Sequence, residues 1–232
     1  MNSIEARNIW KSLRGDYVLS GVNLSVRTGE AVGLFGASGS GKSTLFNILL
    51  GIIEPDRGRV HVDGHPVGGL PTDARARLGL GYVPQRPFIP PHLTVTEAFA
   101  MAAEGARIAD RAAAVQDVMD VLSISHLSRR PLRKLSGGER RRAEIGYVLV
   151  TRPRYLLLDE PFVGLDPLAV DALIATLRGL VGNGIGLLIA EHNHVDATRL
   201  VGRYYILDNG TLTARPEQDE AEDFDEMMDL HW

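Results

Sequence analysis

A glycine-rich segment that joins an apolar run to a helical pattern constrains the fold of this chain more than any other feature. The segment reads Gly36-Ala37-Ser38-Gly39-Ser40-Gly41-Lys42-Ser43-Thr44, between the apolar residues 31–35 and a helical pattern that reaches about residue 50. Its glycines let backbone N–H groups turn inward around phosphate oxygens, and the amino end of the following helix adds partial positive charge. This is the pattern of a phosphate-binding P-loop. We therefore expect a strand, loop and helix unit of an α/β nucleotide-binding domain.

The residue types of the P-loop indicate how a nucleotide would be held. Lys42, one of the few lysines in an arginine-rich chain, is expected to reach the β- and γ-phosphates. Ser43 would offer its hydroxyl to Mg²⁺, and Thr44 would contact the α-phosphate. A chance glycine and serine loop is the alternative, and the placement between strand and helix makes it rare. The residues expected to bind the nucleotide here are Gly36, Ser38, Gly39, Ser40, Gly41, Lys42, Ser43 and Thr44.

The rest of the chain alternates between strand and helix patterns, which is typical of a layered α/β domain. Apolar strand runs at 154–159 and 185–190 alternate with helical patterns at 138–150 and 168–181. Two tight turns, at Asp63-Gly64 and Asn209-Gly210, predict β-hairpins because both residue pairs tolerate the positive φ that such turns require. Antiparallel pieces should therefore flank a mostly parallel sheet.

Between Pro87 and Lys134 the sequence has helical patterns and no strand run. Thr94 or Thr96 can cap a helix over 97–103, and residues 106–122 predict a second helix. We predict an α/β fold: a P-loop NTPase core with a mostly parallel sheet, an antiparallel β subdomain, and a helical subdomain inserted at about residues 87–137.

Composition excludes several classes of protein. With 232 residues, 44% of them apolar, the chain can bury a sizeable core. Its apolar runs are far shorter than the roughly 18 residues that span a bilayer, and its first residues do not resemble a secretory signal. It has no cysteine, which excludes disulfides and thiolate metal sites. We expect a protein of the cytosol.

Charge is distributed unevenly along the chain. Residues 216–232 carry eight acidic residues and no lysine or arginine, so the remaining body is mildly basic although the whole chain has a net charge of -4. Such a body suits an anionic ligand but lacks the basic stripe of a nucleic-acid binder, so we expect no nucleic-acid partner. In the tail, Phe224, Met227, Met228 and His231 are spaced as on one face of a helix. A docking amphipathic helix and a disordered acidic extension both remain open.

Two further segments carry chemistry that a nucleotide-hydrolysing site needs. The apolar run 155–158 ends in Asp159-Glu160, where one carboxylate can order Mg²⁺ through water and the other can polarise the attacking water. The segment Leu135-Ser136-Gly137-Gly138-Glu139 opens a helix and exposes its N–H groups. Each segment alone is an ordinary strand end or helix cap.

In combination and in this order, the motifs resemble those of the ATP-binding cassette (ABC) family. The resemblance covers about residues 3–213 and rests on the P-loop, Gln85, the Leu-Ser-Gly-Gly signature, the Asp159-Glu160 pair, Gly164-Leu165-Asp166 and His192. Two positions depart from the common pattern. Glu139 replaces a glutamine after the signature, and Asn193 follows His192 where an aspartate is common.

The resemblance implies that two cassettes enclose two ATP molecules, each held by the P-loop of one protomer and the signature of the other. Glu160 is then the general base, and His192 holds the γ-phosphate and the base in register. Gln85 would reach Mg²⁺ and the water, and Asp159 would support the metal. The residues that would act across the dimer are Ser136, Gly137, Gly138 and Asp166. Leu13 occupies the position of the usual adenine-stacking aromatic, so Tyr17 is the substitute candidate.

Several of these residues have ordinary alternatives. Gln85 could be a polar loop residue, and His192 with His194 could form a metal-ligand pair, although no third ligand is evident. The run Arg140-Arg141-Arg142 could bind RNA or phosphate, but we expect a solvated helix face with local salt bridges.

The predicted function is an ATPase subunit that powers an ABC membrane transporter, with ATP and Mg²⁺ as cofactors. Residues 1–213 would form the ATPase domain and 214–232 an acidic tail. The partners would be a second cassette, identical or related, and a separate transmembrane permease whose coupling helix docks on the helical residues 85–134. The chain would then lie on the inner face of the cell membrane. Local similarity extends to lipopolysaccharide-exporter and branched-chain amino-acid-importer cassettes. The alternatives are a non-transport ABC ATPase of iron-sulfur assembly or DNA repair, and a regulatory module without turnover.

Overall fold

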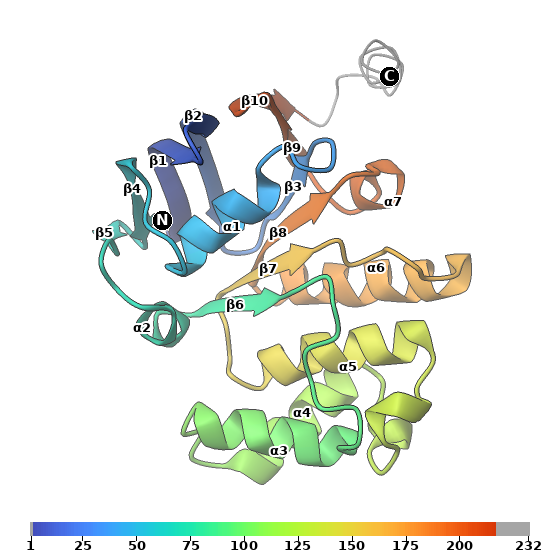
Figure 1. Ribbon diagram of the computed structural model, residues 1–232. Coiled ribbons are helices and arrows are strands. Elements are labelled where there is room, and N and C mark those ends of the chain that lie inside the picture. Colours follow the sequence, from blue (N-terminus) through green and yellow to red (C-terminus); the bar gives the residue numbers. More distant parts are fainter. Residues whose placement is uncertain (1, 217–232) are drawn as a thin grey trace.

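Residues 2–216, the part of the chain that this computed structural model describes, form two β-sheets, with helices on both faces of the larger one (Figure 1). The larger sheet has the strand order β10-β9-β3-β8-β7-β6. All neighbouring strands in it are parallel except β10 and β9. Its strands are β3 (Ala31–Phe35), β6 (Leu80–Val83), β7 (Tyr155–Asp159), β8 (Gly186–Glu191), β9 (Arg203–Asp208) and β10 (Thr211–Pro216).

The central strands are apolar along their whole length because both faces of the sheet are covered. In β7, Tyr155 and Leu157 point into a core shared with α1 and the smaller sheet, whereas Leu156 and Leu158 point into the core on the other face. Strands buried on both faces read as continuous apolar runs. This arrangement explains why a run such as Tyr-Leu-Leu-Leu predicts a strand correctly.

The smaller sheet is antiparallel and has the order β2-β1-β4-β5. Its strands are β1 (Ser3–Leu13), β2 (Asp16–Arg27), β4 (Arg57–Val62) and β5 (His65–Pro66). The sequence patterns predicted the β4-β5 hairpin, but they missed β1. Register shifts between Ala6 and Ile9 and again up to Ser12 interrupt the alternation of buried and exposed side chains in β1, which hides the strand from periodicity.

Both predicted hairpins are confirmed. Asp63 and Gly64 have φ values of 50° and 79° between β4 and β5, and Asn209 and Gly210 have 44° and 76° between β9 and β10. Positive φ at both central residues is the geometry that these dipeptides favour in two-residue turns.

The helices lie in layers around the larger sheet. In Figure 1, α1 lies between the two sheets, α6 and α5 cover the opposite face, and α3 and α4 lie beyond α5. The helices are α1 (Lys42–Leu50), α2 (Thr72–Arg77), α3 (Val95–Gly105), α4 (Arg111–Val121), α5 (Gly137–Leu149), α6 (Pro167–Gly182) and α7 (Val195–Thr198), with 3₁₀ turns η1 (Ser125–Leu127) and η2 (Leu132–Lys134). Gly146 allows α5 to approach α3 closely, because a Cβ there would overlap the ring of Phe99.

The predicted helical character of the segment after Pro87 is confirmed, with one correction. Thr94 caps α3 through a capping box with Glu97. The second helix begins at Arg111 and not at residue 106, because Arg107 has a φ of 58° and the Asp110 side chain caps the amino end. The strand β6 and the short helices α2 and α7 were not predicted.

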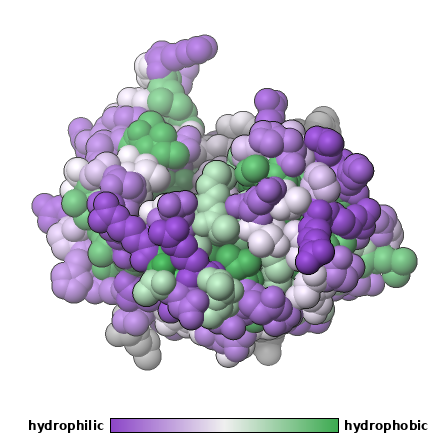
Figure 2. All heavy atoms as spheres, turned by 90° about the horizontal axis from the view of Figure 1, so that it is seen from below, coloured by the Kyte–Doolittle hydropathy of each residue, from purple (hydrophilic) through white to green (hydrophobic). Residues whose placement is uncertain are grey.

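The fold class predicted from the sequence is confirmed: a mostly parallel α/β core with an antiparallel sheet and a helical layer. Among the helices of residues 2–216, none has the length and apolarity to cross a bilayer. Seen from the side of α3 and α4, the surface is mostly hydrophilic, with smaller hydrophobic areas between (Figure 2). Residues 217–232, for which the sequence leaves an amphipathic helix and a disordered extension open, lie outside the described residues.

Candidate nucleotide-binding site

The P-loop connects β3 to α1 in a conformation that leaves its hydrogen-bond donors exposed to a ligand. Gly41 precedes α1 with a φ of 108°, and no side chain of residues 2–216 caps this helix. The first N–H groups of a helix have no partner inside the helix, and together with the helix dipole they favour an anion. The amino end of α1 is therefore suited to bind phosphate.

Lys42 is the cation at the centre of this loop. It is 6% exposed, and its Nζ donates to the carbonyl oxygens of Gly36 at 2.6 Å and Ala37 at 2.9 Å. Burial lowers the pKa of Lys42, and the nearby carboxylates of Glu160 and Asp159 oppose this effect only in part. A desolvated ammonium held inside a glycine loop is well placed to contact phosphate oxygens.

Residues from separate elements meet around a hollow of about 370 Å³ beside the P-loop. It is lined by Ser38, Gly39, Gly41, Lys42, Ser43, Thr44, Gln85, Glu160 and His192. The last three follow β6, β7 and β8, so the hollow lies at the carboxyl ends of parallel strands, where ligands bind in open α/β sheets. The fold thus brings Gln85, Glu160 and His192 to the P-loop.

Glu160 makes the contacts that join these three residues. It follows β7 with a φ of 45°, a left-handed conformation that costs a non-glycine residue about 1 kcal/mol. Its N–H donates to the carbonyl of Ala190 at 2.9 Å, which fixes this turn to β8. Gln85 Nε2 donates to Oε2 of its carboxylate, and Nδ1 of His192 lies 3.5 Å from Oε1. The carboxylate therefore lies between Gln85 and His192.

Asp159 lies one residue earlier, at the end of β7. Its Oδ2 accepts a hydrogen bond of 3.2 Å from the hydroxyl of Tyr82 on β6. Burial raises the pKa of Asp159, and the charge of Glu160 adds to this effect. A hydroxyl at Ser43, an amide at Gln85 and a carboxylate at Asp159 form a set of oxygen donors of the kind that Mg²⁺ prefers. The donor chemistry thus fits this metal.

Glu191 is a buried acid beside the site to which sequence reasoning gave no role. It ends β8, is 2% exposed, and accepts a hydrogen bond of 3.2 Å from the N–H of Phe162. Its carboxylate lies 3.9 Å from Nδ1 of His192. Burial raises the pKa of Glu191 to about 7. An acid that ends an otherwise apolar central strand is the only sequence signal that could have identified it.

The raised pKa of Glu191 predicts a pH dependence of stability. The carboxyl ionises near 4.5 in the unfolded chain but near 7 in the folded protein, so the folded state holds the extra proton between these values. The free energy of unfolding, measured relative to that of Glu191→Gln, should therefore fall by up to about 3 kcal/mol as pH rises from about 4.5 to 7. Above pH 7 it should level off. Urea unfolding of both proteins between pH 5 and 8 measures this. A difference that does not change with pH would contradict it.

The signature residues lie away from the P-loop hollow. Ser136 caps α5 through a capping box with Glu139, and Gly137 is exposed. A Cβ on Gly138 would lie 2.6 Å from the Cβ of Ala169 in α6, so a glycine is required for this close packing. Asp166 caps α6 by accepting a hydrogen bond of 2.9 Å from the N–H of Ala169. The signature and Asp166 are therefore neighbours, and neither lines the hollow.

Tyr17 is the second residue of β2 and does not line the hollow. Its side chain is 60% exposed, and its ring packs edge to face against Trp10 at 5.6 Å between centroids. The carbonyl of the next residue, Val18, would lie 3.0 Å from a Cβ on Gly41. Tyr17 is thus close to the amino end of α1, and Leu13 is also exposed.

The prediction for the Arg140-Arg141-Arg142 run is wrong at its middle residue. Arg141 is 6% exposed and forms an ion pair of 3.2 Å with Glu144, which is 4% exposed. A run of three charged residues normally predicts a solvated helix face, and only the packing of α5 under the sheet buries one of them. No local pattern distinguishes Arg141 from its two neighbours.

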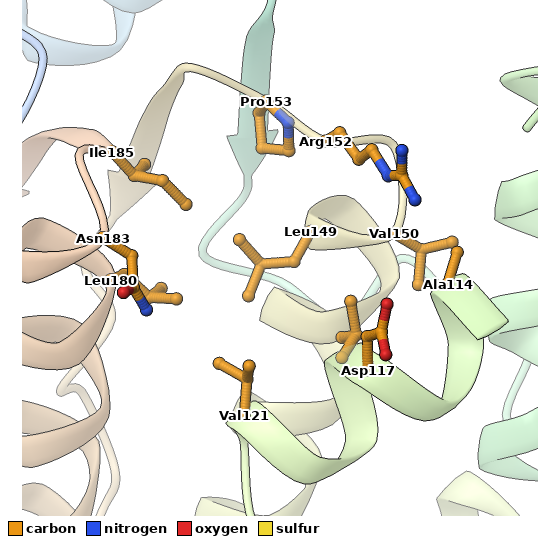
Figure 3. Close-up of a pocket in the computed structure, with 11 residues that line it drawn as sticks. Ala114, Asp117, Val121, Leu149, Val150, Arg152, Pro153, Leu180, Asn183 and Ile185 are labelled. Atoms are coloured by element: carbon orange, nitrogen blue, oxygen red, sulfur yellow. The ribbon is translucent and has the colours of Figure 1, made fainter.

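A second hollow, of about 290 Å³, lies between α4, the end of α5 and the end of α6 (Figure 3). Its walls are mostly apolar, with Leu149, Val121 and Ile185 facing the space and Asp117 and Arg152 nearer its edge (Figure 3). An apolar lining cannot solvate a triphosphate. The P-loop hollow is therefore the candidate nucleotide site.

Comparison with known proteins gives a consistent result. The family model for ABC transporters matches residues 19–163. A probable ABC transporter ATP-binding protein of Azorhizobium caulinodans is 42% identical over 212 residues, covering 90% of this chain and 75% of the relative. The lipopolysaccharide export system ATP-binding protein LptB of Acidithiobacillus ferridurans is 37% identical over 223 residues, covering 95% and 92%.

Solved structures agree with these sequence relatives. An ATP-binding cassette of an ABC transporter in its ADP conformation has a TM-score of 0.86 at 27% identity and covers 94% of this chain and 93% of its own. The cbiO1 protein of Clostridium perfringens, part of the ABC transporter complex cbiONQ, has a TM-score of 0.84 at 26% identity and covers 98% and 93%. With the motifs, the fold and these relatives in agreement, the chain belongs to the ABC transporter family as an ATP-binding cassette.

Proposed function

We propose that this cassette binds and hydrolyses ATP to power a membrane transporter. The observation that carries the proposal is the meeting of Gln85, Glu160 and His192 around the P-loop hollow, since these three follow different strands. The names of the relatives, which refer to transporters and to lipopolysaccharide export, favour transport over iron-sulfur assembly or DNA repair.

We propose the following roles for the residues at this site. ATP phosphates bind to the P-loop N–H groups, and Lys42 exchanges its two carbonyl partners for phosphate oxygens. Glu160 accepts a proton from the attacking water, and Gln85 and His192 hold its carboxylate in position. Ser43, Gln85 and Asp159 would hold Mg²⁺, which supplies positive charge to the phosphates. Tyr17, an exposed aromatic residue next to Val18, would stack on the adenine.

The second ATP-binding surface of the cassette requires a partner. Ser136, Gly137 and Gly138 expose a helix amino end, yet they do not line the P-loop hollow of their own chain. We infer that they complete the hollow of a second cassette, identical or related, with Asp166 next to them at the dimer interface. Each ATP would then be enclosed between two chains.

The size of the ATP-bound protein tests this dimer. Glu160→Gln should form a dimer with saturating ATP and Mg²⁺, as measured by light scattering, because hydrolysis no longer separates the protomers. Adding Ser136→Asp keeps a good helix cap but places a negative charge against the γ-phosphate, so the double variant should bind ATP and remain a monomer. A Glu160→Gln chain that stays monomeric with ATP, alone and with its permease, would contradict the proposal.

The permease would bind on the helical side of the chain. A hollow of about 250 Å³ is lined by Pro87, Ile89, Pro91, Leu132, Arg140 and Glu144. Pro87, Ile89 and Pro91 follow Gln85 closely in the chain, so a coupling helix seated in this hollow would contact the segment that begins at the ATP site. This arrangement supports a location on the inner face of the membrane. The division into an ATPase domain (1–213, with a helical subdomain at about 87–137) and an acidic tail (214–232) stays a prediction.

A further inference from the structure

Arg141 joins three parts of the molecule through one side chain. Its Nη1 donates to the carbonyl oxygen of Pro84 at 2.8 Å, and its Nη2 donates to the carbonyl oxygen of Asp159 at 2.8 Å. Its Nη1 also lies 3.2 Å from Oε2 of Glu144, three residues further along α5. The guanidinium is therefore shared between α5 and the ends of β6 and β7.

The two carbonyls belong to residues that directly precede the catalytic pair. Pro84 comes before Gln85, and Asp159 comes before Glu160. The side chains of Gln85 and Glu160 are hydrogen-bonded to each other. A guanidinium presents its donors in a rigid planar fork, so two bonds from it fix the separation of two backbone segments. Arg141 thus sets the spacing of the chain on both sides of the Gln85–Glu160 contact.

The same residue is tied to the surfaces proposed for the partners. Arg141 lies on α5 little more than one turn beyond Ser136, the cap of this helix. Its ion-pair partner, Glu144, lines the hollow proposed for the permease. A shift of α5 caused by either partner would therefore reach the backbone beside Glu160 through the Arg141 side chain.

We propose that Arg141 is a positioning residue that holds Gln85 and Glu160 in register with α5 and so links the ATP site of a chain to its own signature surface. The inference rests on the proposed function, since the signature surface is taken to contact ATP of the partner cassette.

A purely structural role for the ion pair would not require these carbonyl bonds. Burying two charges costs free energy, and buried pairs replaced together by uncharged residues often leave stability unchanged. Both side chains are buried, and this burial lowers the pKa of Arg141 and raises that of Glu144. An uncharged pair such as that of Arg141→Met/Glu144→Gln could not make the two hydrogen bonds to the carbonyl oxygens of Pro84 and Asp159.

Three variants of the full-length chain separate the two roles. Arg141→Met/Glu144→Gln removes both charges and the carbonyl bonds, Arg141→Lys keeps a cation that cannot span both carbonyls, and Glu144→Gln keeps the carbonyl bonds and removes only the ion pair. Arg77→Met is the matched control, because Arg77 forms an exposed ion pair with Asp73 on α2. Thermal unfolding, ATP binding, kcat and KM for ATP hydrolysis, and hydrogen exchange of nucleotide-free protein are measured for each.

We expect Arg141→Met/Glu144→Gln and Arg141→Lys to lower kcat by about tenfold to 10²-fold, with KM for ATP changed by less than about threefold. Hydrogen exchange should become faster in peptides covering 84–88 and 159–163 in both variants. Glu144→Gln should lower kcat by much less than Arg141→Lys does, and the Arg77→Met control should keep parental kcat and exchange.

Parental kcat and parental exchange in Arg141→Lys or in the double variant would overturn the proposal. So would a loss of kcat in Glu144→Gln as large as that in Arg141→Lys, because it would assign the effect to the ion pair. The exchange measurement needs no nucleotide, so it tests Arg141 even if Glu160→Gln fails to dimerise and the proposed function is wrong.

Discussion

Replacing Glu160 with glutamine is expected to lower kcat for ATP hydrolysis by about 10²- to 10⁴-fold, the usual contribution of a positioned general base. Glutamine has the same shape but cannot accept a proton from water. Because Lys42 and the P-loop N–H groups are unchanged, the dissociation constant for ATP should stay within about threefold of the parental value. The expected signature is thus a chain that binds ATP and barely turns over.

Steady-state phosphate release and calorimetric ATP binding measure the two quantities on the purified chain. Glu104→Gln is a suitable control, since Glu104 pairs with Arg111 at 3.3 Å on an exposed part of the helical layer. Parental turnover in Glu160→Gln would show that another group takes the proton and that the role assigned to Glu160 is wrong.

Lys42→Ala should weaken ATP binding itself and not turnover alone. Lys42 is almost completely buried, and its ammonium is the cation that lies within the P-loop. Truncating one member of a desolvated charge pair typically costs 2–5 kcal/mol, so we expect ATP to bind at least about 30-fold more weakly. Kcat/KM should fall with it, since the bound state is no longer formed at ordinary ATP concentrations.

The matched control for Lys42→Ala is Lys134→Ala, which removes an exposed lysine away from the P-loop hollow. ATP should raise the unfolding temperature of the parent and of this control but not that of Lys42→Ala, because a ligand stabilises only the state that it binds. Unfolding without nucleotide shows whether the loss of the bonds to Gly36 and Ala37 itself destabilises the chain. An ATP-dependent shift of parental size in Lys42→Ala would contradict the role of this residue.

Much of the fold and of the site could be predicted from the sequence, because the signals are local. The P-loop, the caps at Thr94 and Ser136 and the two hairpin turns each depend on the conformational preferences of a few adjacent residues. The all-apolar run that forms β7 likewise indicates a strand covered on both faces. Bulges interrupt the local pattern of β1, so this strand was missed. The Asp110 cap starts α4 later than expected, so the predicted helix was too long.

The sequence by itself determined which chemical groups are present and in what order: a phosphate-binding loop, a pair of acids after a strand, and a serine and glycine helix start. Only the tertiary structure decided which of them meet. Parallel strands gather their carboxyl ends at one edge, which brings Gln85, Glu160 and His192 to the P-loop and leaves Ser136 outside. Burial, which depends on packing between distant segments, distinguished Arg141 from its two arginine neighbours and marked Glu191 at the end of an apolar strand. Spacing along the chain carries no information about that packing.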